Sequence, residues 1–505
     1  MLKLLTAEQT RQADNYTILQ EPVSSIDLME RAASAFVNVF QERYPDRNKG
    51  ISVYCGTGNN GGDGLAIARL LFQEGYSKVM VTIARFSEKA SPDFLINYSR
   101  IKETGIPVRE VTYSYDITSE NADILIDALL GTGLNKPLSG QWQKLVQLLN
   151  SLKRRVVSVD VPSGFKAEGP PEADSLILHA ELVITFQRPK LNFLLPESAA
   201  SIHEFVVADI GLDESFIQTI DSPYLLLTEA DVISCLKQRV PFSHKGTYGH
   251  SLIIAGADET MGAALLCAGA SLFAGSGLTT ACIPSSGLTA LNSKYPEVMA
   301  LLRDKVKPGE VEDWSKYQTA AVGPGLGTSL ESKKMLEASL KKIKRPVVID
   351  ADAINLISSH YELMQLVPEH SIFTPHVKEF DRLFGEHKNW WERLDTGIDR
   401  AKTLGCTIVL KNEYTIVFTT SGECIFNPTG NPAMATGGMG DVLTGIIASF
   451  LAQGYSPRDA ALLGVYIHGK AGDELVSEGS HAVIPASELL EKLPHTIAVL
   501  QKSVS

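Results

Sequence analysis

The sequence predicts an α/β protein built from two doubly wound domains in series. The chain has 505 residues, more than one hydrophobic core usually organises, so at least two domains are expected. In both halves, short runs rich in β-branched residues alternate with longer amphipathic runs of helical period. Such alternation is typical of mostly parallel sheets with helices on both faces.

The first half contains six short apolar runs that we interpret as strands. They occupy residues 51–55, 78–84, 122–130, 155–161, 181–186 and 204–210. Ahead of them, an apolar stripe with helical spacing indicates a helix packed on the core or on another subunit; it consists of Met29, Ala33, Phe36, Val37 and Phe40. The polar, turn-rich stretch 211–225 predicts the domain junction.

The second half repeats this alternation. The predicted strands are residues 251–257, 277–283, 319–325, 345–351, 371–376 and 407–420, the last read as a hairpin pair. Residues 260–293 contain no charged side chain. Because this stretch is rich in Gly, Ala, Ser and Thr and is interrupted by Pro284, it predicts a buried helix followed by a buried strand rather than a membrane span.

Composition narrows the class of protein. Hydrophobic residues make up 44% of the chain and charged residues 21%, as in globular enzymes. The net charge of −12 opposes non-specific binding to nucleic acid or to an anionic membrane. The six cysteines are scattered, without the close pairs of a zinc site. With too short an apolar stretch at its start for a secretory signal, the chain is expected to be cytoplasmic.

A glycine-rich stretch follows the first predicted strand. Gly56–Gly64 (GTGNNGGDG) permits a tight turn with inward-facing amides, and the following LAIARLL starts a helix whose positive end favours an anion. Its spacing fits neither a dinucleotide fingerprint nor a Walker loop. A purely structural turn explains these glycines equally well.

Two further predicted strands of this half end at an aspartate. Asp127 ends one, with Gly131–Pro137 beyond it, and Asp160 ends another, with Ser163 close behind. Ligands collect at the carboxyl ends of strands in such sheets. Asn60, Asp127 and Ser163 offer only oxygen ligands, which suits a hard cation, either monovalent or magnesium. For Asp160 the alternative is a helix cap or a turn.

The second half carries its own set of loop motifs. SHKGTYG (Ser243–Gly249) is either a phosphate cradle or a plain turn, and GPGLG (Gly323–Gly327) follows a strand. DADAIN (Asp350–Asn355) ends another strand, and His376 lies in a loop, where a lone histidine is usually structural. Lys411 at a strand end is placed to meet a nucleotide's phosphates, unless KNEYT is an ordinary hairpin turn.

The segment TGGMGD ends on Asp441, where an apolar helix begins. A capping aspartate is one explanation. The other is phosphoryl transfer, which requires neutralisation of the phosphoryl oxygens and removal of the acceptor's proton. Amides exposed by Gly437, Gly438 and Gly440 would supply the first, and Asp441 the second.

The motifs GNNGGDG, DALLGTG and VDVPSG, in that order, resemble the epimerase domain of the NAD(P)H-hydrate repair enzymes over residues 1–215. This resemblance implies a Rossmann-like three-layer sandwich that interconverts the epimers of the hydrated nucleotide. It implies a potassium ion on Asn60, Asp127 and Ser163, and acid–base work by Asp160. It places the substrate on Asn59, Asn60, Gly61, Gly62, Asp63, Gly131, Thr132, Gly133, Leu134, Asn135, Lys136, Pro137 and Asp160.

The TGGMGD segment is similar to the anion hole and catalytic aspartate of the ribokinase superfamily. Together with SHKGTYG, GPGLG, DADAIN and TPH, it resembles the ADP- or ATP-dependent NAD(P)H-hydrate dehydratases over residues 225–503. This implies a ribokinase-like fold and magnesium on the nucleotide. The hydrated substrate is then expected on Ala264, Gly325, His376 and Asp441, and the adenine nucleotide on Lys411, Asn412, Glu413, Tyr414, Thr415, Gly437, Gly438 and Gly440. Asn412 departs from the family pattern, which has glycine after the lysine.

These resemblances predict a bifunctional, homo-oligomeric enzyme that epimerises hydrated NADH and NADPH and dehydrates the S epimer with ADP or ATP. Two alternatives stay open. One is a ribokinase-like small-molecule kinase with an accessory nucleotide-binding domain, which would release a stable phosphorylated product. The other is an N-terminal domain that only senses a nucleotide, in which case Asp160→Asn would leave epimer exchange unchanged.

Overall fold

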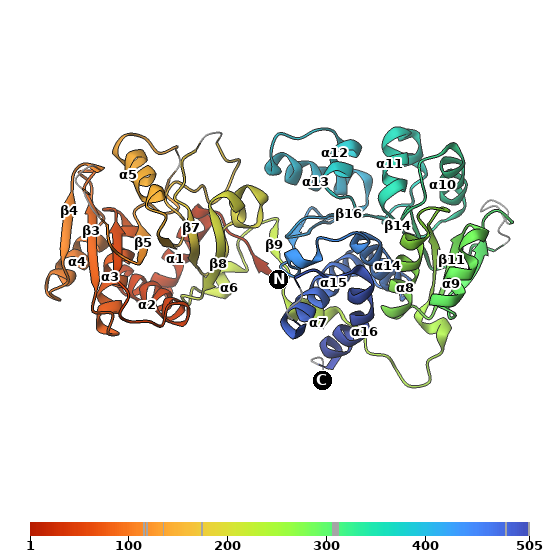
Figure 1. The fold of residues 1–505 in the computed structure, drawn as a ribbon, viewed down its shortest axis with the longest axis horizontal. Helices are drawn as coiled ribbons and strands as arrows, with labels where there is room; N and C mark the ends of the chain where they lie inside the picture. Colours follow the sequence, from red (N-terminus) through yellow and green to blue (C-terminus); the bar gives the residue numbers. More distant parts are fainter. Residues whose placement is uncertain are drawn as a thin grey trace. The chain divides into compact units, whose positions relative to one another are not determined.

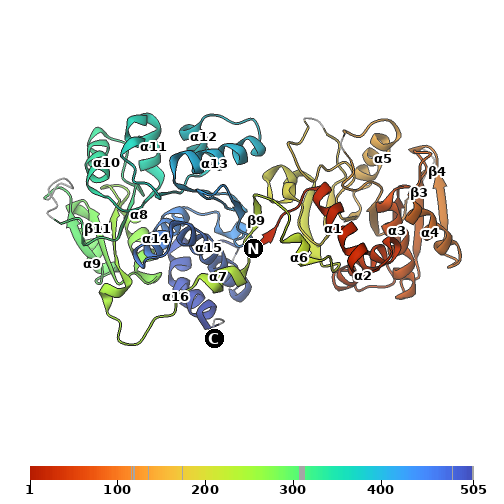
Figure 2. The ribbon, with the colours of Figure 1, turned by 180° about the vertical axis from the view of Figure 1, so that it is seen from behind.

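The computed structural model describes residues 1–114, 117, 120–134, 136–172, 175–305, 313–479 and 482–502 (Figures 1 and 2). The chain folds as two compact units, Lys3–Ser222 and Pro223–Ser505, the latter including Met1–Leu2. Across the described ranges, every helix is too short or too polar to cross a membrane. Each unit is a parallel or mostly parallel sheet with helices on both faces, which confirms the predicted α/β class.

The first unit contains a seven-stranded sheet in the order β4-β3-β2-β5-β6-β7-β8, with every neighbouring pair parallel. Its strands are β2 (Ile51–Cys55), β3 (Val79–Ala84), β4 (Val108–Val111), β5 (Ile124–Ala128), β6 (Arg155–Val159), β7 (Ala180–Phe186) and β8 (Ile202–Ala208). All six predicted strands are confirmed. Strand β4 was not predicted, because it is a four-residue edge strand whose two charged residues interrupt the apolar pattern.

Helices cover both faces of this sheet (Figure 1). They are α1 (Ala7–Gln20), α2 (Ser25–Arg43), α3 (Asn59–Gln73), α4 (Pro92–Lys102), α5 (Gly140–Ser151) and α6 (Glu214–Ile217). Val53 and Ile126 share a core with the predicted apolar stripe, which lies on α2. Tyr54 and Leu125, one residue along, pack with α5 on the other face. The alternation follows from the two-residue period of a strand.

The second unit contains an eleven-stranded sheet in the order β1-β9-β18-β17-β16-β15-β14-β13-β10-β11-β12. Its strands are β1 (Leu2–Lys3), β9 (Tyr224–Leu226), β10 (His250–Ile254), β11 (Leu278–Ile283), β12 (Met299–Leu302), β13 (Thr319–Val322), β14 (Val347–Ile349), β15 (Ile372–Phe373), β16 (Thr407–Leu410), β17 (Ile416–Phe418) and β18 (Cys424–Phe426). The predicted hairpin is confirmed, because β16 and β17 pair antiparallel.

The helices of this unit also lie on both faces of the sheet (Figure 2). They are α7 (Glu229–Cys235), α8 (Met261–Phe273), α9 (Leu288–Lys294), α10 (Leu330–Lys342), α11 (Ala351–Ser359), α12 (Val377–Phe384), α13 (Trp390–Leu404), α14 (Met439–Ala452), α15 (Pro457–Gly479) and α16 (Ala486–Lys502). The uncharged stretch 260–293 forms α8 and the buried strand β11, as predicted. A Cβ on Gly445 of α14 would lie 2.1 Å from the Cys267 carbonyl oxygen, so α8 and α14 pack at backbone distance.

The strand order locates the crevice at the carboxyl edge of each sheet. In the first unit the order reverses between β2 and β5, and in the second between β10 and β13. The loops after these strand pairs diverge to opposite faces and leave a crevice at the carboxyl edge. The glycine-rich segment and the DALLGTG loop follow the first pair, and the GPGLG loop follows β13 of the second.

Candidate functional sites

The glycine-rich segment of the first unit is a helix start rather than a loop. We expected the helix to begin at Leu65, but α3 begins at Asn59, after Gly58. A Cβ on Gly61 would lie 2.0 Å from the Gly56 carbonyl oxygen, and one on Gly64 would lie 2.4 Å from the Ala128 Cβ. These two glycines therefore let the first turns of α3 pack against the ends of β2 and β5.

Asp127 and Ser163 form one buried hydrogen-bonded group. The Asp127 carboxylate accepts from the Ser163 hydroxyl (2.6 Å), the Ser163 amide (2.8 Å), the Ser158 hydroxyl (2.9 Å) and the Leu129 amide (3.2 Å). Burial raises the pKa of Asp127, and the bonds from Ser163 oppose that rise. The Ser163 hydroxyl also accepts from the Leu130 amide at 3.0 Å.

Asn60 lies against the loop that follows Asp127. A Cβ on Gly131 would be 3.2 Å from the Asn60 Cβ and 3.6 Å from its Oδ1. The Asn60 Nδ2 is buried and has no hydrogen-bond partner within the described part of the chain. The structure thus places the three predicted cation ligands around the backbone of residues 129–131.

Asp160 is held in an uncommon conformation at the end of β6. Its φ is +64°, in the left-handed region that non-glycine residues rarely adopt. Its Oδ1 accepts from Lys190 Nζ (2.7 Å), the Thr185 hydroxyl (3.0 Å) and the Phe186 amide (3.1 Å). Three donors, one of them charged, hold this carboxylate oxygen in place. Strain of this kind often occurs at functional sites.

A cavity of about 730 Å³ opens beside Asp160 in this unit. Asp160 and Lys190 line it together with Asp14 of α1. The predicted substrate residues that line it are Asn59, Asn60, Asp63, Gly131, Thr132, Gly133, Leu134 and Asp160. Gly61 and Gly62 are buried in the packing of α3 instead, and Asn135 lies outside the described residues.

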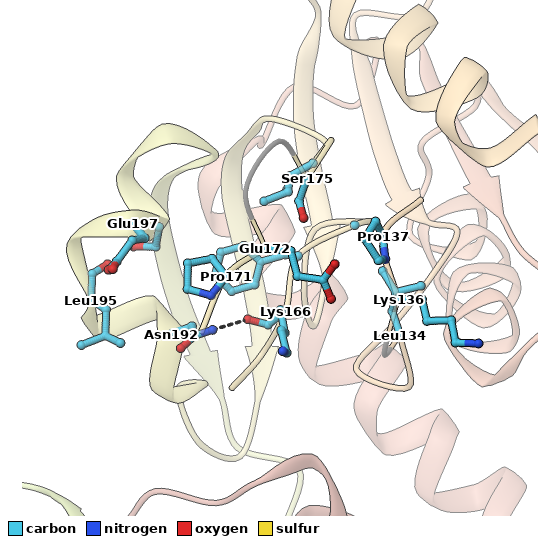
Figure 3. A pocket seen from close by; sticks show the side chains of 14 residues that line it. Leu134, Lys136, Pro137, Lys166, Pro171, Glu172, Ser175, Asn192, Leu195 and Glu197 are labelled. Atoms are coloured by element: carbon cyan, nitrogen blue, oxygen red, sulfur yellow. Dashed lines mark hydrogen bonds between the residues drawn. The ribbon is translucent and has the colours of Figure 1, made fainter. Parts of the chain in front are cut away.

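Lys136 and Pro137 line a separate, smaller cavity of about 50 Å³. Figure 3 shows them opposite Asn192, Leu195 and Glu197. The Asn192 Nδ2 donates to the Lys166 carbonyl oxygen at 2.7 Å. Leu134 lines both cavities. The described residues of the predicted substrate loop are therefore divided between two cavities, with 131–134 lining the larger and 134, 136 and 137 the smaller.

Five charged residues of the larger cavity were not predicted from the sequence: Arg11, Asp14, Lys89, Asp93 and Lys190. Lys190 is only 6% exposed and pairs with Asp160. Burial raises the pKa of Asp14 to about 6; Lys190 opposes the rise and Asp160 adds to it. Burial, with Asp160 and Asp14 nearby, raises the pKa of Asp63 well above its usual value. Asp14 could not be found from motifs, because it lies on a helix before the first strand of this sheet.

In the second unit, Asp441 lies in the first turn of α14. The helix begins after Gly438, whose φ is +93° and whose Cβ would lie 2.5 Å from Leu266 Cδ1, so this position requires glycine. Burial raises the pKa of Asp441 to about 7; Asp350 adds to the rise, Lys411 opposes it and Asp352 adds to it. Asp441 is therefore a base of useful strength near neutral pH.

Lys411 lies beside the glycine-rich start of α14. A Cβ on Gly440 would be 3.4 Å from Lys411 Nζ, whereas a Cβ on Gly437 would meet nothing within 4 Å. Lys411 Nζ donates to Asp350 Oδ1 at 2.9 Å and lies 3.9 Å from Glu379 Oε2. Although burial disfavours the ammonium, these two carboxylates raise the pKa of Lys411 above its usual value.

Asp350 and His468 support this arrangement, and neither was predicted to have a role in the site. Asp350 is 1% exposed and accepts from the Thr444 hydroxyl of α14 at 2.9 Å as well as from Lys411. His468 Nε2 lies 3.1 Å from the Met439 carbonyl oxygen at the start of α14. Burial lowers the pKa of His468 to about 4, so its ring is neutral at pH 7. The strand-end position of Asp350 was a usable signal, whereas His468 lies inside a helix and gives none.

His376 is next to Lys411 across a parallel bridge, and it caps α12. Its Nδ1 accepts from the Glu379 amide at 3.1 Å, while the Glu379 carboxylate accepts from the His376 amide at 2.8 Å. The side chain remains 49% exposed. His376 thus caps α12 through its Nδ1, and its exposed surface leaves room for a contact with a ligand.

Gly325 packs against the start of α8, on which Ala264 is fully buried. Gly325 has a φ of +57°, and its Cβ would lie 2.9 Å from the Ala263 Cβ. The Thr260 hydroxyl donates to the Gly325 carbonyl oxygen at 2.6 Å. The Ala264 Cβ would lie 2.9 Å from a Cβ on Gly256 in the loop after β10. The GPGLG loop and the loop after β10 therefore pack closely on the start of α8.

The segment Lys411–Thr415 joins β16 to β17 at the same edge as Gly440. The Thr415 hydroxyl donates to the Asn412 carbonyl oxygen at 3.1 Å. The Asn412 Nδ2 is buried without a hydrogen-bond partner among the residues described. Burial raises the pKa of Tyr414 to about 12, and Glu413 adds to this. Asn412 thus offers an unused donor where a nucleotide is expected.

The SHKGTYG motif serves folding in this unit. A Cβ on Gly249 would lie 1.9 Å from the Ala452 carbonyl oxygen at the last residue of α14, and one on Gly277 would lie 1.7 Å from the Lys245 carbonyl oxygen. Asp441 lies eleven residues earlier on α14, about 16 Å along the helix axis. Of the two readings of this motif, the structure favours the plain turn.

Two different protein families match the two units of this chain. Residues 25–192 match the family model described as YjeF-related protein N-terminus, and residues 251–495 match that described as NAD(P)H-hydrate dehydratase. A solved ADP/ATP-dependent NAD(P)H-hydrate dehydratase from Bacillus subtilis, co-crystallised with ATP and Mg²⁺, is 30% identical with a TM-score of 0.50. The match covers 55% of this chain and 98% of that one.

Relatives with the full two-unit organisation are also found. The bifunctional NAD(P)H-hydrate repair enzyme of Moorella thermoacetica is 33% identical, over 99% of this chain and 98% of its own. The enzyme of the same name from Escherichia coli is 32% identical, over 93% of this chain and 89% of its own. Together with the two family models, these similarities establish that the chain belongs to the family of bifunctional NAD(P)H-hydrate repair enzymes.

Proposed function

We propose that Asp441 is the base of a nucleotide-dependent dehydration in the second unit, and that the cavity beside Asp160 is the epimerase site. The enzyme interconverts the R and S epimers of hydrated NADH and NADPH, and it converts the S epimer to NADH or NADPH with ADP or ATP. The observation that carries the dehydratase assignment is the placement of Asp441, with its raised pKa, beside Lys411 and Gly440.

The dehydration proceeds as a phosphoryl transfer followed by elimination. Asp441 takes the proton of the substrate hydroxyl, and the hydroxyl oxygen bonds to the terminal phosphorus of the nucleotide as the bridging P–O bond breaks. The ring nitrogen's lone pair then expels phosphate. The C–O bond breaks, the adjacent ring carbon loses a proton, and the dihydronicotinamide is restored. Phosphate leaves far more readily than hydroxide.

The chain's own groups hold the two reactants. The hydrated substrate is assigned to Ala264, Gly325, His376 and Asp441, and the adenine nucleotide to Lys411–Thr415, Gly437, Gly438 and Gly440. Lys411 and the amides at the start of α14 neutralise phosphoryl oxygens. Magnesium bound to the nucleotide would supply further charge neutralisation.

In the first unit, Asp160 is assigned to the substrate and to proton transfer. The cavity of about 730 Å³ lies within the range of volumes that is usual for small-molecule sites. Asn59, Asn60, Asp63 and residues 131–134 surround it. Lys136 and Pro137, in the neighbouring cavity (Figure 3), are assigned to a more distant part of the nucleotide.

A potassium ion fits the group formed by Asn60, Asp127 and Ser163. The donors are all oxygens with a single carboxylate, and that carboxylate already accepts four hydrogen bonds. Such a weak field suits a monovalent ion better than a divalent one. We expect epimerisation to depend on K⁺ and to fall when Na⁺ replaces it at equal ionic strength. An equal rate in both salts would remove this assignment.

Oligomerisation is the remaining proposal. Val240 and Phe242 are 58% and 106% exposed, and Phe242 has a φ of +62°. Exposed apolar groups on one segment favour a contact between copies of the chain. Light scattering of the purified protein is expected to give a mass above 54.8 kDa. A monomeric mass at micromolar concentration would contradict this.

The function as a whole is tested by incubating the protein with mixed-epimer hydrated NADH, K⁺, Mg²⁺ and either ATP or ADP. Return of dihydronicotinamide absorbance is expected to reach completion, because the first unit replenishes the S epimer. A plateau at the starting fraction of one epimer would remove the epimerase assignment. A stable phosphorylated product without regained absorbance would instead favour a ribokinase-like kinase.

A further inference from the structure

Asp14 is a second carboxyl group in the epimerase cavity, contributed by a different element from Asp160. It lies on α1, whereas Asp160 ends β6, and both line the cavity with Lys190. Its neighbour Ala13 is fully buried, and the Thr17 hydroxyl accepts from the Asp213 amide at 2.9 Å. Helix α1 is therefore anchored in the unit, and it holds Asp14 at a fixed place in the cavity wall.

The carboxyl groups of Asp160 and Asp14 differ in the hydrogen bonds that they already accept. The Asp160 Oδ1 accepts from Lys190, Thr185 and Phe186. The Asp14 carboxyl makes no hydrogen bond to any residue within the described ranges. Its charged neighbours are Lys190, Asp160 and Asp63. On its own helix, Arg11 is paired with Glu8 at 2.6 Å.

Epimerisation by loss and return of water requires proton transfer on two faces of the ring. The hydroxyl departs from one face, and water returns to the other. A proton-transfer group must lie about 2.6–3.2 Å from its partner atom, so one fixed carboxylate cannot serve both faces. We propose that Asp14 is the second acid–base group of the epimerisation, acting on the face that Asp160 does not reach. This inference rests on the proposed epimerase function.

Asp14 and Asp160 together supply both proton transfers of the reaction. Protonated Asp14 gives its proton to the departing hydroxyl. The C–O bond breaks, water leaves, and the ring nitrogen's lone pair forms a C=N bond. A water molecule then bonds to the same carbon from the opposite face and gives a proton to the Asp160 carboxylate. The ring carbon is inverted, one proton has moved from Asp14 to Asp160, and the reverse reaction moves it back.

Asp63 and Asp93 are the other carboxyl groups that line this cavity in the described residues. Burial raises the pKa of Asp63 well above its usual value, and Asp160, Asp14 and Asp93 add to the rise. Asp93 accepts from the Ser25 hydroxyl at 2.6 Å and is engaged there. With a pKa of about 6, Asp14 exchanges its proton readily near neutral pH.

The test compares full-length wild-type protein with Asp14→Asn, Asp14→Glu and, as a matched control, Glu8→Gln, which removes an exposed carboxylate from the same helix. Initial rates of conversion of the pure R epimer to the S epimer are followed by chromatography without nucleotide. Affinity for the R epimer, near-UV circular dichroism and Tm show whether the cavity is intact. Dehydration of the pure S epimer with ATP reports on the other unit.

Asp14→Asn is expected to lower kcat for epimerisation at least about 100-fold while affinity and dehydration stay within about threefold of wild type. Asp14→Glu is expected to recover part of the rate, and Glu8→Gln to match wild type. In wild type, kcat/KM should fall as pH rises through about 6, because Asp14 loses the proton it must donate. An Asp14→Asn rate within about threefold of wild type, or a changed KM with an unchanged kcat, would overturn the inference. If wild type leaves the epimer ratio unchanged, the proposed function itself fails.

Discussion

Lys411 Nζ and Asp350 Oδ1 lie 2.9 Å apart, and this pair connects the end of β14 to the end of β16. Asp350 also accepts from Thr444 of α14. The buried carboxylate thereby ties the ammonium to the helix whose first turn carries Asp441. Removing one partner of such a buried pair leaves an uncompensated charge, which costs about 3–5 kcal/mol. A substitution that removes one partner of this pair is therefore expected to lower the stability of the unit as well as to alter the position of the other side chain.

The pH dependence of dehydration follows from the raised pKa of Asp441. The base form of Asp441 increases as pH rises through about 7. We expect kcat/KM for dehydration of the S epimer to rise about tenfold per pH unit below 7 and to level off above it. Absorbance assays from pH 5 to 9 measure this. A profile that is flat from pH 5 to 7 would contradict a titrating base at residue 441.

Asp441 should also reduce stability, because its carboxylate is disfavoured in the folded protein. Its folded pKa of about 7 exceeds the unfolded value of 3.8, so stability falls as pH rises from about 4 to 7. Asp441→Asn removes this effect. Its Tm relative to wild type is therefore expected to be higher at pH 8 than at pH 4, as measured by calorimetry. An equal difference in Tm at both pH values would contradict the raised pKa.

Two neighbouring glycines of the TGGMGD segment should respond differently to alanine. Gly440→Ala places a methyl group 3.4 Å from Lys411 Nζ, where the nucleotide's phosphates are assigned. We expect kcat for dehydration to fall at least about tenfold with little change in Tm. Gly438→Ala combines a φ of +93° with a 2.5 Å contact to Leu266, so it should lower Tm as well. Equal losses of Tm in both variants would contradict this distinction.

The packing role of the first-unit glycines is tested by Gly61→Ala. A Cβ there would lie 2.0 Å from a backbone oxygen, which cannot move without displacing the end of β2. We expect a loss of about 1–3 kcal/mol in the free energy of unfolding. Gly58→Ala is the control, since its Cβ would meet nothing within 4 Å. Urea unfolding followed by circular dichroism separates the two, and equal midpoints would contradict the packing role.

The sequence predicted the strands and the strand-end loops because hydrophobic period and glycine position are local signals. Gly440, Asp441 and Lys411 were found in this way, and the structure brings them together. Asp14, Lys190 and His468 were not found, because their roles depend on which distant segments fold beside them. The start of α3 was placed too late, because glycines that serve tight helix packing have the same pattern as a loop.

The most direct test of the account is single-turnover dehydration of the S epimer by Asp441→Asn. Asparagine preserves the size of the side chain but cannot accept the hydroxyl proton as a carboxylate does. We predict a decrease in rate of about 10²–10⁴-fold, with nucleotide affinity unchanged and epimerisation intact as the internal control. Restoration of dihydronicotinamide absorbance at the wild-type rate would contradict the claim that Asp441 activates the substrate hydroxyl.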